Sequence, residues 1–97
     1  MGRDLHFEDI NHRRVFTDTN LSVALDRVLE KAGTEGLLSG VEKYADTMFN
    51  PFQLSHVQAE LELVSRRHPE LEEDVRALSE VFEKVVRIRG YVWIVGD

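Results

Sequence analysis

The side chains in this sequence that could carry acid–base or metal chemistry are four histidines and several closely spaced carboxylates. His56 and Glu60 lie four residues apart, so on a helix they would share one face and could both bind a metal ion. No third or fourth ligand stands at a spacing that would complete such a site, and the chain has no cysteine. A surface His–Glu pair is the simpler interpretation, and we expect neither a metal nor a cofactor.

Catalysis by paired carboxylates needs two acids in a dry cleft with well-separated pKa values. The closely spaced acids of this chain instead fall on the polar sides of the helices expected below, where water surrounds them. They are Glu60 and Glu62, Glu72 and Glu73, and Glu80 and Glu83. Ser55 and His56 would point in different directions on a helix, so they do not form a nucleophile–base pair. The sequence therefore predicts no catalytic residues and no enzyme.

The net charge of the chain is −6, and most of it lies in the later part of the sequence. Residues 1–33 carry a net charge of −1, whereas residues 34–97 carry −5. An acidic surface repels phosphate backbones, which disfavours nucleic-acid binding, and it attracts basic protein surfaces. The alternative is that the acidity serves only solubility. The acids that we expect to contact a basic partner are Glu60, Glu70, Glu72, Glu73 and Asp74.

The length and composition of the chain set broad limits on its class and location. With 97 residues, of which 42% are apolar, we expect a single domain over residues 1–97 with a hydrophobic core. No apolar run reaches the roughly 18 residues of a membrane span, and the start of the sequence lacks the apolar stretch of a signal peptide. We therefore expect a cytoplasmic protein that does not enter a membrane.

Apolar residues recur at helical spacing in four segments. The first segment runs from about Leu21 to Gly33, where a glycine suits the left-handed residue that follows a helix. Its possible N-caps are Asp18, Thr19 and Asn20. Ser39 and Glu42 fit the capping box of a second, short helix at about residues 40–48.

Two prolines mark the start of the remaining helices. Asn50-Pro51 begins the third helix with a cap and a favourable first-turn residue, and Gln53 can reach back to the cap. This helix is expected to end near Arg67. Pro69 opens the fourth helix, at about residues 70–89. Because only one or two residues separate them, the third and fourth helices should form an antiparallel hairpin.

The segment Tyr91–Val95 follows Gly90 and consists of aromatic and β-branched residues, which predicts a buried strand. One strand cannot satisfy its own backbone N–H and C=O groups, so it must pair with the N-terminal segment, with another chain, or with both. Residues 3–17 allow either a short hairpin with a turn at Asn11–Arg14 or one strand followed by an irregular arm.

These elements predict a mainly α fold of the α+β type. It would contain three to four helices, including an antiparallel helical hairpin, and a short C-terminal strand paired with the N-terminal segment. That strand is apolar on both faces, whereas one helical layer covers a single face, so the other face must meet the N-terminal arm, the first helix or a partner. The aromatic residues, expected mostly in the core, are Phe49, Phe52, Phe82, Tyr91 and Trp93.

Three parts of the later sequence form a pattern: Asp46–Asn50 with Gln53, the pair Glu60-Leu61, and the ending Tyr91–Asp97. With this pattern, residues 44–97 resemble a group of small uncharacterised bacterial proteins. Similar small acidic helical proteins serve as immunity proteins, which neutralise a cognate toxin by binding it. The resemblance implies a role of this kind but transfers no binding residue, because such proteins vary where they touch their toxins.

The sequence thus favours a non-enzymatic protein-binding module. Its most concrete form is an immunity-type inhibitor that blocks a basic toxin surface with an acidic helical face. The alternative is a small structural homodimer, in which the terminal strand or the first helix packs against its twin. The sequence does not decide whether a small-molecule pocket lies between the short second helix and the helical hairpin.

Overall fold

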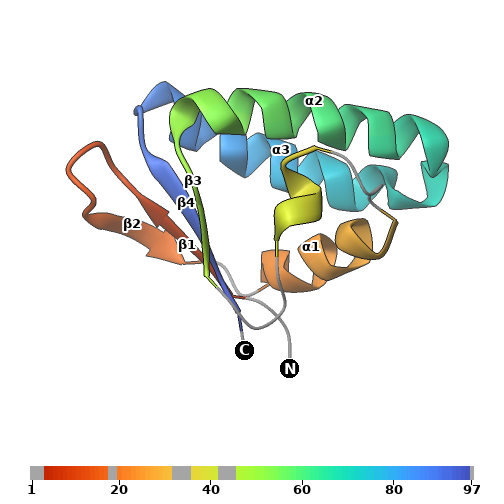
Figure 1. Cartoon of the computed structure of the whole chain (residues 1–97), viewed down its shortest axis with the longest axis horizontal. Helices are drawn as coiled ribbons and strands as arrows, with labels where there is room; N and C mark the ends of the chain where they lie inside the picture. Colours follow the sequence, from red (N-terminus) through yellow and green to blue (C-terminus); the bar gives the residue numbers. More distant parts are fainter. Residues whose placement is uncertain (1–3, 18–19, 32–35, 42–45, 97) are drawn as a thin grey trace.

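The computed structural model describes residues 4–17, 20–31, 36–41 and 46–96. Within these ranges, three α-helices lie against one side of a four-stranded antiparallel sheet with the strand order β2-β1-β4-β3 (Figure 1). The prediction of a mainly α fold is therefore wrong, and the fold is α+β. The prediction failed because the C-terminal strand is not an appendage to helices but an inner strand of a full sheet.

The C-terminal strand β4, Tyr91–Val95, pairs with a strand on each side. Strand β1, Asp4–Glu8, runs antiparallel to it along its full length, which confirms the predicted pairing with the N-terminal segment. Strand β2, Arg14–Thr17, pairs with the other edge of β1, so the hairpin alternative for the N-terminal region is confirmed. Strand β3, Thr47–Phe49, pairs with the second edge of β4.

The short helix predicted at about residues 40–48 is wrong where the structure describes it. Leu38–Gly40 forms one 3-10 turn, η1, and Thr47–Phe49 forms β3. Pairing with β4 satisfies the backbone of residues 47–49 and buries Phe49, and this tertiary gain outweighs the helical spacing of the local sequence.

Most of the capping residues predicted for the first two helices lie outside the described residues, so these caps can be checked only in part. The hydroxyl of Ser39 donates to the carbonyl of Gly36 at 2.6 Å and does not cap a following helix. The other residues in these predictions, Asp18, Thr19, Gly33 and Glu42, lie outside the described residues. The cap of the third predicted helix is confirmed, because Asn50 Oδ1 accepts from the N–H of Gln53 at 2.8 Å and Gln53 Oε1 accepts from the N–H of Asn50 at 2.9 Å.

The three helices bury their apolar stripes against the sheet. They are α1, Asn20–Lys31; α2, Pro51–Arg67; and α3, Glu72–Arg87, which follows the 3-10 turn η2, Pro69–Leu71. Helices α2 and α3 form the predicted antiparallel hairpin, and α3 packs between α1 and α2 (Figure 1). Among the described residues, no helix has the length and apolar character needed to cross a lipid bilayer.

The core lies between the helices and one face of the sheet. Its fully enclosed side chains come from all three helices and from β1 and β4: Leu5, Phe7, Leu25, Val28, Leu54, Val57, Leu61, Leu78, Phe82, Val85, Val92 and Ile94. Phe49 also belongs to the core, as expected. Phe52 does not, because its side chain is 74% exposed on the first turn of α2.

The end of α3 explains the glycine before β4. The N–H of Gly90 donates to the carbonyl of Val85 at 2.9 Å, and that of Arg89 donates to Val86 at 3.0 Å, which satisfies the last turn of the helix. Arg89, with φ of 54°, takes the left-handed conformation that glycine usually takes there. Glycine is required at position 90 for a steric reason, because a Cβ there would lie 1.9 Å from the carbonyl oxygen of Glu8.

We predict that Gly90→Ala lowers the free energy of unfolding by about 1–3 kcal/mol, because β1 must move away from the added methyl group. Urea unfolding of the two proteins measures the difference. Gly40→Ala is the matched control, since a Cβ there meets nothing within 4 Å. The control should stay within about 0.5 kcal/mol of the parent protein. Equal losses in both variants would contradict the close approach at Gly90.

Candidate functional site

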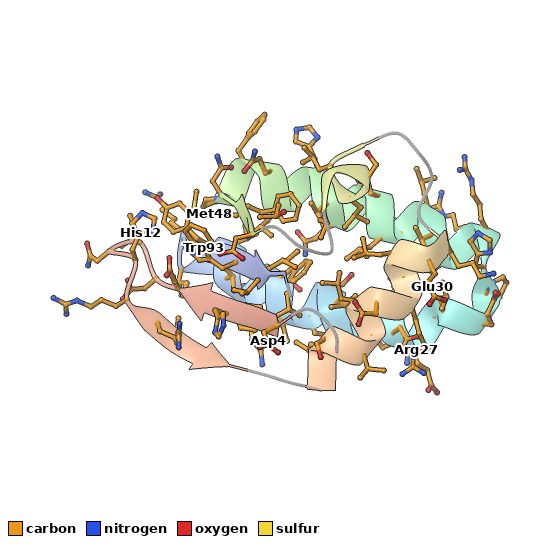
Figure 2. The ribbon with its side chains drawn as sticks, turned by 60° about the horizontal axis from the view of Figure 1, so that its bottom comes forward. Asp4, His12, Arg27, Glu30, Met48 and Trp93 are labelled. Carbon is orange, nitrogen blue, oxygen red and sulfur yellow. The ribbon has the colours of Figure 1, made fainter. Side chains whose placement is uncertain are left out.

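The sheet has one face on the core and one face that no described helix covers. Alternate residues of a strand point to opposite faces, so the neighbours of the buried strand residues lie on the second face. We call this second surface the open face, and it consists of Asp4, His6, Glu8, Met48, Tyr91, Trp93 and Val95. In Figure 2 the labelled side chains of Trp93 and Met48 lie next to each other on neighbouring strands.

The open face has the apolar character that the sequence predicted for the second side of the C-terminal strand. Two of its three expected covers are excluded for the described residues. The N-terminal segment forms β1 and β2 inside the same sheet, and the first helix packs on the core side, where Leu25 is fully buried. Met48 is 37% exposed, and Tyr91, Trp93 and Val95 are partly exposed.

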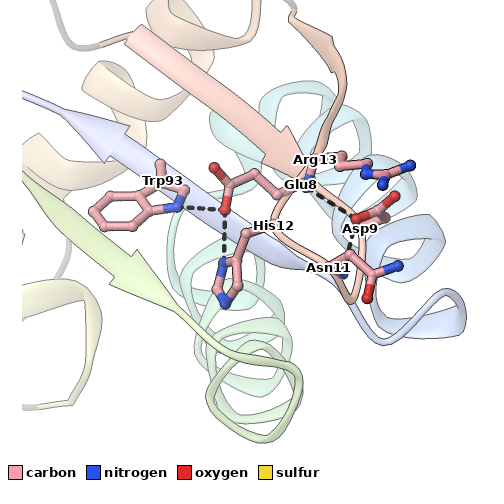
Figure 3. Close-up of polar contacts among 6 residues, drawn as sticks. All are labelled: Glu8, Asp9, Asn11, His12, Arg13 and Trp93. Carbon is pink, nitrogen blue, oxygen red and sulfur yellow. Dashed lines mark hydrogen bonds and ion pairs between the residues drawn. The ribbon is translucent and has the colours of Figure 1, made fainter.

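A carboxylate holds the aromatic side chains of this face in place (Figure 3). The indole N–H of Trp93 donates to Glu8 Oε1 at 2.7 Å. The ring nitrogen Nδ1 of His12 lies 3.0 Å from the same oxygen, and because a carboxylate only accepts, this nitrogen carries the hydrogen. The His12 ring also stacks on Tyr91, with the ring centres 4.0 Å apart and the planes 17° from parallel. We call these four residues the ring cluster.

The backbone of the β1–β2 turn positions His12 for these contacts. Asp9 Oδ1 accepts from the N–H groups of Asn11, at 2.8 Å, and Arg13, at 3.0 Å, and fixes the turn. His12 then has φ of 61°, a left-handed conformation that costs a side-chain-bearing residue roughly 1–2 kcal/mol. The contacts of its ring with Glu8 and Tyr91 offset part of this cost. Such an outlier, held by its surroundings, is typical of a functional surface.

His6 lies in the middle of the open face, opposite Trp93 in the strand register. Its Nδ1 is enclosed and has no hydrogen-bond partner among the described residues. An unpaired buried nitrogen costs about 1–3 kcal/mol, so Nδ1 of His6 lowers the stability of the fold in this arrangement. Because the atom is enclosed, a partner could reach it only after a side chain moved.

The hydrogen bonds of the ring cluster fix how its polar groups are presented. Glu8 Oε1 already accepts from two donors, so this oxygen is not presented as a general base. In the described part of the chain, no group of three or more histidine and acidic side chains is placed to hold a metal ion. What the ring cluster provides is a set of aromatic surfaces whose orientation is fixed before any partner arrives.

The structure brings together four of the five acids predicted to contact a partner. Glu70, Glu72, Glu73 and Asp74 occupy η2 and the first turn of α3, where they favour the positive end of the helix dipole. Two arginines partly neutralise this group, because Glu72 pairs with Arg76 at 3.1 Å and Asp74 with Arg27 at 3.3 Å. Glu70 lies 3.8 Å from the ring of His68.

Glu60 lies apart from the other four acids and makes structural contacts with the backbone. Its two carboxylate oxygens accept from the backbone N–H groups of Leu37, at 2.9 Å, and Leu38, at 3.0 Å, and so tie the start of η1 to α2. A Cβ at Gly36, where φ is 93°, would lie 2.6 Å from Glu60 Oε1. The surface pair expected between His56 and Glu60 is replaced by these contacts, and the His56 ring instead meets Phe52 edge-on at 4.8 Å.

Sequence reasoning predicted a second apolar face for the strand Tyr91–Val95, but it expected the aromatic residues Tyr91 and Trp93 mostly in the core, whereas both are partly exposed, and it missed Glu8 and His12. Glu8 precedes a turn, and its contact with Trp93 spans 85 residues, so no local pattern could indicate it. The available signal was the alternation of Leu5 and Phe7 with polar residues, which places His6 and Glu8 together on the opposite face of β1.

Comparisons with known proteins give no further guide to this site. No protein-family model matches the chain, no curated protein is significantly similar to it, and no solved structure matches it. The function must therefore be inferred from the properties of the open face.

We predict that Glu60→Gln lowers the free energy of unfolding by about 1–3 kcal/mol, because the amide offers one acceptor to two N–H groups and turns its own donors toward one of them. Urea unfolding measures the loss, and hydrogen exchange should accelerate at the amides of Leu37 and Leu38. Glu62→Gln is the control, since Glu62 is exposed on α2 and pairs with Arg66 on the surface. Similar small effects in both variants would contradict a structural role for Glu60.

The conformation of His12 can be tested with two variants that both remove the ring. We predict that His12→Ala is less stable than His12→Gly by about 1 kcal/mol, because alanine, unlike glycine, is strained at positive φ. Urea unfolding gives the difference, and the loss of ring contacts cancels in the comparison. Equal stability of the two variants would show that the turn is not left-handed at this residue.

Proposed function

We propose that this chain is a non-enzymatic protein-binding module that engages its partner through the open face. The observation that carries the proposal is the uncovered sheet surface, on which Tyr91, Trp93, Met48 and Val95 remain partly exposed opposite a fully packed core. Contiguous apolar surface of this kind, with polar groups at its border, is typical of sites that contact other proteins.

The ring cluster supports this function on energetic grounds. Tryptophan and tyrosine dominate the binding energy of many interfaces, because each buries a large surface and loses little side-chain freedom. Here Glu8 fixes the Trp93 indole, and stacking on His12 fixes Tyr91, so less conformational entropy is lost on binding.

Single-stranded nucleic acid is a less suitable ligand for the same face. Aromatic residues on an open sheet can stack on bases, but such surfaces also carry positive charge along the backbone path. The carboxylates of Asp4 and Glu8 lie on the open face, and that of Asp46 lies just before β3. These charges repel phosphate groups.

The immunity-type role predicted from the acidic residues is a narrower form of the same function. Glu70, Glu72 and Glu73 are exposed and adjacent, but the pairing of Glu72 and of the neighbouring Asp74 with arginines reduces the local charge. An acidic contact at the start of α3 thus remains a prediction, and the open face is the stronger candidate.

Site-specific photocrosslinking tests the proposal. A benzophenone amino acid replaces Met48 on the open face or, as a control, Glu80 on the exposed side of α3. We expect irradiation in the native cell to join a protein to position 48 and not to position 80. The joined protein is then purified, and its affinity for the unlabelled chain is measured by titration.

The affinity should fall at least tenfold, about 1.4 kcal/mol, in Tyr91→Asp, because the aromatic anchor is replaced by a charge that must lose its water. Glu80→Gln should leave it unchanged. Circular dichroism checks that both variants fold. Crosslinking at position 80 alone, or an affinity that Tyr91→Asp does not alter, would exclude the open face as the binding surface.

A further inference from the structure

We propose, resting on the protein-binding role above, that the open face receives a basic amphipathic helix of a different protein. The face has two properties that favour such a segment. Its charged groups are carboxylates, and the strands β1, β4 and β3 together present a patch of the size of one helix. Both properties follow from the register of the sheet.

The end of the open face around the last residues of β4 is acidic. Asp4 stands opposite Val95 in the register, is exposed, and begins β1 at the end away from His12 (Figure 2). On the other side of β4, Asp46 Oδ1 accepts from the N–H of Gly96 at 3.2 Å, which holds this exposed carboxylate beside the end of the strand. Neither acid forms an ion pair with another described residue. We call Asp4 and Asp46 the acidic end.

A basic side chain fits between these two carboxylates. Asp4 and Asp46 lie on the two sides of β4, and neighbouring strands are about 4.8 Å apart, so roughly 10 Å separates the two acids. A lysine or arginine placed above Val95 would lie within reach of both. The residues of the open face include no lysine or arginine. A cation at the acidic end therefore has to come from the partner.

The apolar part of the face continues from the acidic end along β4. Val95, Trp93 and Tyr91 follow one another at two-residue intervals, and Met48 stands beside Trp93 on β3. Four residues of strand span about 13 Å, the length of two to three helical turns, and three strands are about as wide as one helix with its side chains. One partner helix along β4 would therefore cover the patch, just as helices cover the core side of the sheet (Figure 1).

A second copy of this chain fits the face less well than a different protein does. The apolar stripes of α1, α2 and α3 already pack in the core of their own chain, so they are not available to another molecule. Two open faces packed together would bring Asp4 and Glu8 of each copy into an interface whose open-face residues include no lysine or arginine. Two chains of net charge −6 also repel each other, whereas the same charge attracts a basic segment.

Trp93 gives a direct signal for binding, because it is the only tryptophan of the chain and lies in the open face. The probe is a synthetic peptide of about 16 residues without tryptophan or tyrosine, long enough to form a helix. Leucines at i, i+3, i+4 and i+7 provide its apolar stripe, and lysines occupy one terminal turn. We expect saturable binding that shifts the Trp93 emission to shorter wavelength.

Two matched peptides separate the effect of charge from that of the helix. With glutamates in place of the lysines, the peptide should bind roughly tenfold or more weakly, because like charges then meet at the acidic end. With proline at the central position, which breaks the helix, the loss should be similar. No binding of the lysine peptide at millimolar concentration, or an equal affinity of either matched peptide, would overturn the proposal.

Charge reversal in the protein locates the contact. Asp4→Lys should lower the affinity for the lysine peptide roughly fivefold or more and raise the affinity for the glutamate peptide. Glu80→Lys is the matched control, because it changes the net charge equally at an exposed position on α3, and it should alter either affinity less than about twofold. Circular dichroism confirms that both variants fold. An equal loss in both variants would exclude the acidic end as the contact.

The photocrosslink at position 48 separates this proposal from the binding role on which it rests. Mass spectrometry identifies the segment of the joined protein, and we expect a basic amphipathic helix. A joined segment of another kind, or a joined second copy of this chain, would overturn the basic helix and leave the open face as the binding surface. If position 48 joins no protein, both proposals fail, because the basic helix is proposed as a part of that protein.

Discussion

The backbone of β4 is the part of this molecule that constrains all others. Val92 and Ile94 are fully buried, and the strand lies inside the sheet, so its N–H and C=O groups must be satisfied on both edges. β1 satisfies one edge and β3 the other. This demand brings the N-terminal segment across the molecule, holds residues 47–49 extended, and fixes which side chains of the sheet face the helices. The open face consists of the sheet side chains that point away from the helices.

The parts of the fold that sequence reasoning predicted well depend on local signals. The start of α2 follows from Asn50, Pro51 and Gln53, whose capping contacts lie within four residues of one another. The apolar stripes of α2 and α3 and the short connection between them similarly predicted the hairpin. Strand β3 could not be found in this way, because it has only three residues, and its extended conformation comes from pairing with a strand more than 40 residues later.

In the candidate site, too, only the features that depend on local sequence could be predicted. The apolar nature of both sides of Tyr91–Val95 was enough to predict a surface in need of a cover. The residues of the ring cluster could not be predicted in this way, because Glu8 and Trp93 meet only through the pairing of β1 with β4. Glu60 failed as a contact candidate for a related reason: an acid on an amphipathic helix is normally solvated, but here the start of η1 presents two backbone N–H groups to it.

The pairing of β1 with β4 also has a consequence for synthesis of the chain. The β1–β2 hairpin leaves the ribosome before the other described elements, and the edge of β1 that β4 will occupy stays unpaired until residue 95 is made. At about 5–20 residues per second, this interval lasts roughly 4–17 seconds. An unpaired edge next to Leu5 and Phe7 is a template for pairing with other nascent chains. The vulnerability of this protein to misassembly is therefore set by the late position of one short strand in the order of translation.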